Sequence, residues 1–307
     1  MSKPIEDKLS KIPVINVLVL IGKKLILPGF EGLSVYDLVE IYVIGILKGT
    51  FSARASAISW SFFLSLFPFL LFLLNLIPYV PIDRFEENFF EFINGALPTQ
   101  SSNFFSEIFE DIASNPRGGL LSTVFVLSIL FMTNGVNAVF SGFEYSYHVT
   151  LNRNFVRQYV VALGVSIIVA SLLLITVIGT LYFSYLVDDL NKIGVVDDTV
   201  FWLTFGKYAL FVFMIFIIIA TLFYFGTSEG RQNTFFSPGA FMTTFLIMIT
   251  TYLFGIYIDN FSNYNQLYGS IGAMLILMLY IWLNANLVLL GFELNASLNQ
   301  LRKNFRS

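Results

Sequence analysis

The side chains that could do chemistry in this chain are asparagine amides placed inside long apolar runs. An amide donates and accepts hydrogen bonds without titrating, so the chemistry available to it is non-covalent recognition of a polar group. Such amides also bond neighbouring helices to one another, and this structural role is the alternative. The candidates for contacting a substrate are Asn75, Asn134, Asn137, Asn284 and Asn286.

A polar stretch, DNFSNYNQLYGSIG, separates the last two apolar runs and adds further candidates. Tyr264, Asn265 and Tyr268 could contact the polar headgroup of a substrate, and the alternative is a tight hairpin that only fixes the last helix. Gly269 and Gly272 would permit close packing where that helix begins. The stretch therefore predicts either a binding surface or a turn.

Other residues are expected to shape helices or to lie at a membrane interface. Pro68 removes a backbone donor inside the first apolar run, so a kink is expected there. Gly135, beside Asn134, lets a neighbouring helix approach closely. The expected residues of the cytoplasmic interface are Glu144, His148, Arg153 and Glu293.

The residue types that familiar enzymes need are missing from the chain. It has no cysteine and one histidine, and it contains no GxxxxGK[ST] phosphate loop, no HExxH and no GxSxG. We therefore expect no catalytic residue, no metal and no cofactor. A formal net charge of −3 and a pI near 5.2 argue against a nucleic-acid partner, which would need a basic surface.

The composition is that of an integral membrane protein. Hydrophobic residues make up 56% of the chain and charged residues 12%, whereas a soluble domain has about a quarter of its residues charged. The sequence predicts an all-α, polytopic bundle of six transmembrane helices, at roughly 58–80, 119–141, 159–187, 206–226, 236–258 and 270–293. An N-terminal segment, 1–57, would precede the membrane domain, 58–298, and a short tail, 299–307, would follow it.

Positively charged residues predict the orientation of the bundle. Of the 17 lysines and arginines, 13 fall in segments 1–57, 142–158, 227–235 and 294–307, and four fall in the other loops. Lysine and arginine are enriched in cytoplasmic loops, so we expect both termini in the cytoplasm. The first outer loop is acidic, and it makes the outer face acidic as well.

Two regions are amphipathic but too short to span a membrane. Residues 33–48 place a narrow polar stripe on an apolar helix, which predicts an interfacial helix on the inner leaflet or, equally, a helix packed on the bundle. The first outer loop, 81–118, predicts two short amphipathic helices. These would form a lid over the bundle, or a surface that contacts lipid or a partner.

Four segments, in this order, resemble a known family. They are ASAISWSFFLSLFPFLLFLL, TNGVNAVF followed by Arg153, SPGAFMTTFL, and SNYNQLYGSIGAMLILMLYIWLNANLVLLGFELNASL. In these segments the chain is similar to the YihY/BrkB family of bacterial inner-membrane proteins, whose members were once labelled ribonuclease BN. The resemblance implies a six-span α-helical protein of the inner membrane. The ribonuclease label is not supported, because the sequence offers neither an acidic metal cluster nor a basic RNA-binding surface.

Two functions are compatible with these observations. The first is a transporter or flippase-like conduit for a lipid or other amphiphile in envelope biogenesis, which the family's suggested biology also implies. Spans with few charges suit acyl tails, and a few amides suit a headgroup. The alternative is a non-transporting scaffold that docks an envelope protein through the acidic outer loop. The expected partners are therefore membrane lipid and an envelope protein, and not nucleic acid.

Overall fold

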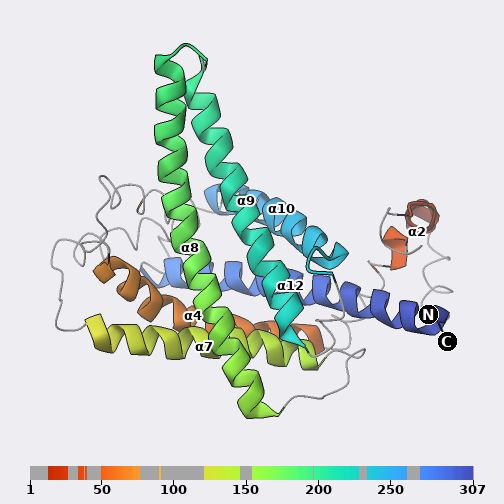
Figure 1. The fold of residues 1–307 in the computed structure, drawn as a ribbon. Helices are drawn as coiled ribbons and strands as arrows, with labels where there is room; N and C mark the ends of the chain where they lie inside the picture. Colours follow the sequence, from red (N-terminus) through yellow and green to blue (C-terminus); the bar gives the residue numbers. More distant parts are fainter. Residues whose placement is uncertain are drawn as a thin grey trace.

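Six long helices form most of the structure, which is a computed structural model (Figure 1). It describes residues 13–26, 34–37, 39, 50–76, 90, 121–145, 154–195, 197–227, 234–260 and 270–306. Each of the six is long and apolar enough to cross a membrane, which confirms the predicted all-α polytopic fold. Within the described ranges there is no strand, only an isolated bridge between Ile26 and Ser34.

The six helices follow the six predicted apolar runs, and a shorter helix precedes them. Several helices are longer than predicted, and the two largest extensions are at polar ends, since the first helix begins at Thr50 and the last continues to Arg306. A hydropathy window stops at polar residues, whereas TFSARASA and ELNASLNQLRKNF contain no glycine or proline and so continue the helix. The bounds are α2 (Pro13–Lys24), α4 (Thr50–Leu76), α7 (Leu121–Glu144), α8 (Phe155–Lys192), α9 (Thr199–Gly226), α10 (Pro238–Asn260) and α12 (Ser270–Arg306).

Consecutive helices pair into three hairpins: α4 with α7, α8 with α9, and α10 with α12. The turn between α8 and α9 is short, and Gly194 adopts a φ of +73° in it. The Asp198 carboxylate then accepts a hydrogen bond from the backbone N–H of Phe201 at 2.9 Å, which caps α9. Between hairpins, α7 packs on α8, α4 on α12 and α9 on α10.

The three hairpins meet in one half of the molecule. The main core takes residues from the first turns of α4, α8 and α10, from the last turns of α7 and α9, and from the second half of α12. We call this region the convergent half. Beyond it, the hairpin of α8 and α9 leaves the other four helices at a steep angle (Figure 1). The most deeply buried members of this core include Phe51, Ala55, Phe140, Phe143, Ala162, Ala220, Ala240 and Leu289.

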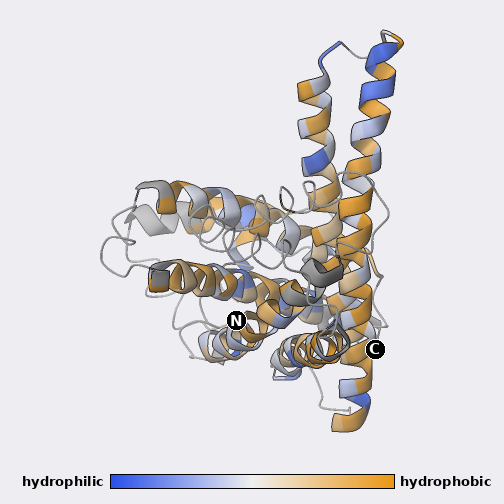
Figure 2. Cartoon of the chain, turned by 90° about the vertical axis from the view of Figure 1, so that its left-hand side faces the viewer, coloured by the Kyte–Doolittle hydropathy of each residue, from blue (hydrophilic) through white to orange (hydrophobic). Residues whose placement is uncertain are grey.

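The hairpin of α8 and α9 is longer than a membrane crossing requires. α8 has 38 residues, and at 1.5 Å per residue it is about 57 Å long against about 30 Å of hydrocarbon. The tip of the hairpin is hydrophilic (Figure 2). Aromatic side chains are exposed near this tip, and exposed aromatic residues often mark the membrane interface, so the hairpin either tilts or projects its tip beyond the hydrocarbon. These aromatic residues are Tyr182, Tyr185, Phe201, Trp202, Phe205 and Tyr208.

The described residues near the N-terminus include a helix cap. The N–H and the hydroxyl of Ser34 both donate to the Asp37 carboxylate at 2.8 Å, and the Asp37 N–H donates back to the Ser34 hydroxyl at 3.3 Å. A helix therefore begins beside Ser34, at the start of the interfacial helix predicted for 33–48. Most of that predicted helix lies outside the described residues, as does the outer loop 81–118 apart from Phe90.

Candidate binding site along helix α7

The last three turns of α7 carry a polar stripe on one side of the helix. Asn134, Asn137, Ser141 and Glu144 follow one another at spacings of three, four and three residues, which places them on one face. This face is directed at α8, because Asn134 and Ser141 both hydrogen-bond side chains of that helix. The structure thus brings together two predicted binding residues and one predicted interface residue.

Gln158 of α8 connects three members of this stripe. Its side chain is buried, and its amide is oriented with the nitrogen toward Glu144, because the opposite orientation would set its oxygen against the carboxylate. The nitrogen then donates to the two carboxylate oxygens at 2.9 and 3.0 Å. The amide oxygen accepts from the Ser141 hydroxyl at 3.2 Å and lies 3.1 Å from the Asn137 side chain. A buried amide with partners at both ends fixes α7 to α8.

At the other end of the stripe the polar groups reach the surface. The Tyr159 hydroxyl of α8 donates to the side-chain oxygen of Asn134 at 3.3 Å, and this hydrogen bond is exposed. The exposed side chains one turn away on each helix are apolar, including Leu130 on α7 and Val156 on α8. The pair is therefore an accessible polar spot on an apolar surface where α7 packs on α8.

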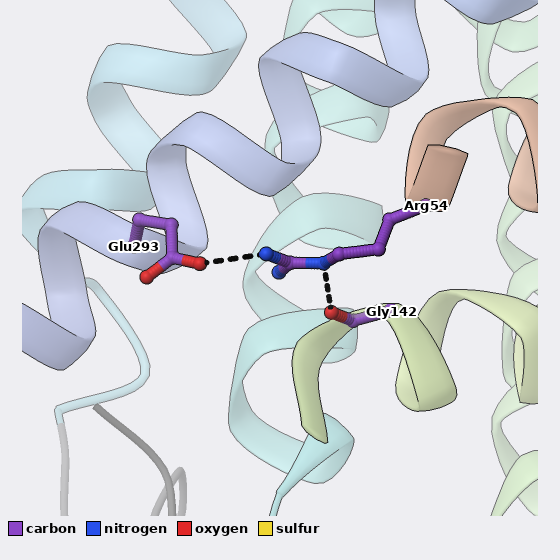
Figure 3. A network of polar contacts seen from close by, with 3 residues as sticks. All are labelled: Arg54, Gly142 and Glu293. Carbon is purple, nitrogen blue, oxygen red and sulfur yellow. Dashed lines mark hydrogen bonds and ion pairs between the residues drawn. The ribbon is translucent and has the colours of Figure 1, made fainter. Parts of the chain in front are cut away.

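Arg54 and Glu293 form a buried ion pair that joins three helices (Figure 3). Nη1 of Arg54 in α4 lies 3.0 Å from Oε1 of Glu293 in α12, and the two side chains are 9% and 7% exposed. Nε of Arg54 donates to the carbonyl oxygen of Gly142 in α7 at 2.8 Å. The guanidinium also lies over the Phe51 ring, 5.2 Å from its centroid. The pair ties the start of α4 to the end of α7 and to α12.

The sequence did not predict that these two side chains would pair in a buried position, and the cytoplasmic location of Glu293 stays a prediction. The sequence places Glu293 at the cytoplasmic interface and Arg54 in a segment before the first helix. In the structure both lie inside the convergent half, where α4 has already begun and α12 continues past Glu293. Pairing offsets part of the cost of desolvating two opposite charges, whereas hydropathy assigns that cost to each residue separately.

Two further candidate amides, Asn284 and Asn286, belong to α12. In α12, Asn286 donates to the carbonyl of Trp282 at 2.7 Å and Asn284 to that of Tyr280 at 2.9 Å, so each bonds to its own helix. Gly272 is buried near the start of α12. The side chain of Asn75, in α4, lies outside the described residues. Six other candidates lie wholly outside the described residues, and their roles stay predictions: His148, Arg153, Tyr264, Asn265, Tyr268 and Gly269.

Gly135 and Pro68 lie along the contact between α4 and α7. A Cβ on Gly135 would lie 3.2 Å from the Ser65 hydroxyl, so the two helices approach closely there. α4 continues through Pro68 to Leu76, and the Ser128 hydroxyl of α7 hydrogen-bonds the Pro68 carbonyl. The neighbouring helix thus supplies a polar partner beside the proline.

The contact between α10 and α12 depends on residues that sequence reasoning passed over. A Cβ on Gly239 would overlap the carbonyl oxygen of Gly291, so the two backbones are in contact. The Asn295 side chain accepts from the Gly239 N–H at 2.9 Å and donates to the Ser237 hydroxyl at 2.9 Å. Asn295 therefore caps the first turn of α10. The available signal was the Ser-Pro-Gly start of α10 together with a glycine and an asparagine one turn apart in LLGFELN.

Replacing Asn295 with alanine should lower the free energy of unfolding by about 1–3 kcal/mol, because the buried Gly239 N–H loses its acceptor. The measurement is SDS-induced unfolding from mixed micelles, followed by tryptophan fluorescence. Asn299→Ala, one turn further along α12 and only half-buried, is the matched control and should change little. Equal effects of the two substitutions would contradict the capping role.

Together these features define a class: a polytopic α-helical membrane protein whose three hairpins meet around buried polar groups. Among the described residues, no group of three or more His, Cys, Asp or Glu side chains could hold a metal ion. The chain belongs to the family described as Virulence factor BrkB, which matches residues 45–307. This match confirms the resemblance drawn from the sequence.

Two relatives show how the similarity is distributed. A ribonuclease-like protein of Bacillus subtilis, YfkH, is 26% identical over 254 residues, which cover 82% of this chain and 91% of that protein. A UPF0761 membrane protein of Xanthomonas axonopodis is 40% identical over 65 residues, which cover 21% of this chain and 15% of that protein. No solved structure matches the chain. The family is one of membrane proteins, and the ribonuclease-like wording belongs to a relative of low identity.

Proposed function

We propose that this chain is a conduit for a lipid or other amphiphile in the bacterial inner membrane, of the transporter or flippase type. The observation that carries the proposal is the pair formed by Asn134 and Tyr159, a polar spot on an exposed apolar surface. In hydrocarbon, polar groups are costly unless another polar group meets them. A lipid headgroup supplies that partner while its acyl chains remain on the apolar surface.

The polar stripe of α7 provides a route for the headgroup. Asn134 precedes Glu144 by ten residues, which is about 15 Å along a helix. Between them, the amide of Gln158 already bonds Ser141 and Glu144. A headgroup that moves along the stripe exchanges hydrogen bonds with Gln158, so no buried polar group is left without a partner on the way.

The proposed orientation places both termini in the cytoplasm and the convergent half toward the cytoplasmic leaflet. The diverging ends of the hairpins then lie toward the outer leaflet (Figure 1). Lipid reaches Asn134 directly from the bilayer, because the pair is exposed. The sequence contains no nucleotide-binding loop, so movement follows a lipid gradient or the membrane potential, or a partner supplies the energy.

Replacing Asn134 with leucine together with Tyr159 by phenylalanine should slow lipid movement about three- to tenfold, because the headgroup loses two hydrogen-bond partners. The assay uses the full chain in liposomes that contain a fluorescent phospholipid. The fraction of label that dithionite quenches from outside is followed over time. The unchanged chain should accelerate transbilayer movement over protein-free vesicles.

Tyr182→Phe provides the matched control, since Tyr182 is an exposed tyrosine of α8 near the hairpin tip. It should leave the rate unchanged, with folding of every variant checked by its SDS unfolding midpoint. An unchanged chain that moves lipid no faster than empty vesicles would overturn the conduit. If such a chain still captures an envelope protein through residues 81–118, the scaffold becomes the better proposal.

A further inference from the structure

Two buried hydrogen-bond donors beside the ion pair have no acceptor within the described part of the chain. They are Nη2 of Arg54, whose side chain is 9% exposed, and the hydroxyl of Ser297. In Figure 3 the other two guanidinium nitrogens of Arg54 make the contacts to Glu293 and Gly142. A buried donor without an acceptor is costly, and the cost is larger for a charged donor.

Ser297 behaves unlike most hydroxyls of the other long helices. Ser166, Ser184 and Thr176 each donate to the backbone carbonyl one turn earlier, at 2.8, 3.0 and 2.8 Å. Ser297 makes no such bond, although the carbonyl of Glu293 lies one turn before it. Its hydroxyl therefore remains available to a group from outside the helix.

Ser297 lies one turn from Glu293, the residue that pairs with Arg54. Glu293 and Ser297 are one turn apart on α12, which puts their Cβ atoms about 5–6 Å apart. Arg54 reaches the same place from α4, since its Nη1 is 3.0 Å from the Glu293 carboxylate. The Phe51 ring beneath the guanidinium packs in the same core as Ala296, next to Ser297. α4 and α12 thus present a cation and a hydroxyl on adjoining turns.

We propose that Arg54 and Ser297 form a binding site for the oxyanion of a phosphate group, with Nη2 and the hydroxyl as its donors. A guanidinium recognises phosphate through paired N–H donors in a plane, and here one terminal nitrogen is already engaged by Glu293 while the other is not. A neutral acceptor would satisfy the hydrogen bonds but would gain less from the positive charge than an anion does. The site therefore selects an anion.

The neighbouring carboxylate limits the charge of the ligand. Arg54 and Glu293 together carry no net charge, so a ligand with one negative charge meets less repulsion from Glu293 than a ligand with two. A phosphodiester, which carries a single charge, fits better than a phosphate monoester dianion. A phospholipid headgroup and free inorganic phosphate both offer a phosphate oxyanion. The proposed site does not depend on the proposal that the chain moves lipid.

Ser297→Ala separates binding from folding. The hydroxyl bonds nothing among the residues that the structure describes, so the variant should unfold at the same SDS concentration as the unchanged chain or a higher one. With the ligand, it should lose roughly tenfold in affinity, because a hydrogen bond to an anion is removed. Affinity is read from the ligand-dependent rise in the thermal unfolding midpoint of the full chain in detergent.

The probes are dihexanoyl phosphatidylglycerol, inorganic phosphate, and dihexanoyl glycerol as the phosphate-free match. Ser56→Ala, an exposed hydroxyl of α4 that bonds its own helix, is the control and should bind as the unchanged chain does. Stabilisation by either phosphate probe that is weakened only by Ser297→Ala supports the site, and the stronger probe identifies lipid or free phosphate as the source. No stabilisation by either phosphate probe, equal stabilisation by dihexanoyl glycerol, or binding unchanged in Ser297→Ala would overturn it.

Discussion

Replacing Gly291 with valine is expected to separate α10 from α12, with a loss of at least about 3 kcal/mol in the free energy of unfolding. Any Cβ at this position overlaps the Thr243 hydroxyl and lies 2.8 Å from the carbonyl oxygen of Gly239. The first obstacle is the end of a side chain, which can rotate. The second is backbone, so relief requires the whole of α10 to move. The SDS unfolding midpoint and the yield of monodisperse protein in detergent measure the effect.

Two further variants test whether the cause is helix contact. In α10, Gly255 has open space where a Cβ would lie, so Gly255→Ala should be neutral or should stabilise the helix by up to about 1 kcal/mol. Thr243→Ala combined with Gly291→Ala should recover part of the loss caused by Gly291→Ala alone, since it removes the nearer obstacle. Equal losses at Gly255 and Gly291 would point to helix propensity instead of helix contact.

The helices could be predicted from the sequence because the signals for them are local. A run of apolar residues long enough to cross a bilayer can be recognised from the sequence alone. The ends of α10, at Pro238–Asn260, each lie within two residues of the predicted run. The ends that differ most, at Thr50 and Arg306, are those where a polar but helix-forming segment extends the apolar run. Neither the proline of α4 nor the glycines of α7 interrupt a helix in the structure.

The candidate site was less accessible to prediction because its members belong to different helices. Asn134, Asn137 and Glu144 are recognisable as polar residues, but Gln158, which contacts Asn137 and Glu144, shows no local feature that selects it. The stripe itself could have been read from the spacing of these residues with Ser141. In the sequence, Arg54 looks like one residue of a polar segment. Its partner, Glu293, becomes evident only when α12 packs on α4. The steep departure of α8 and α9 likewise follows from packing and has no sequence pattern of its own (Figure 1).

Removing one partner of the buried ion pair is expected to be far more harmful than removing both. Arg54→Met leaves the Glu293 carboxylate without its guanidinium, and Glu293→Leu leaves the guanidinium without its counter-ion. Each change should cost about 3–5 kcal/mol in SDS unfolding, because a charge stays buried without its opposite. In the double variant both charges are gone, and the bond from Arg54 to the Gly142 carbonyl and the contact with the Phe51 ring are lost as well, but no charge stays buried alone, so it should unfold closer to the unchanged chain than either single variant.

The exposed pair of Lys192 and Asp189 at the tip of the α8 and α9 hairpin is the control for this double-mutant cycle. Its atoms approach within 2.8 Å, closer than the buried pair, but its side chains are 72% and 74% exposed. Solvent screens such a pair, so Lys192→Met should leave the unfolding midpoint unchanged. Burial, and not the distance between the charges, would then account for the effect at Arg54. Losses at Arg54 and Glu293 that simply add in the double variant would show that the two side chains contribute independently and that their pairing does not hold α4 to α12.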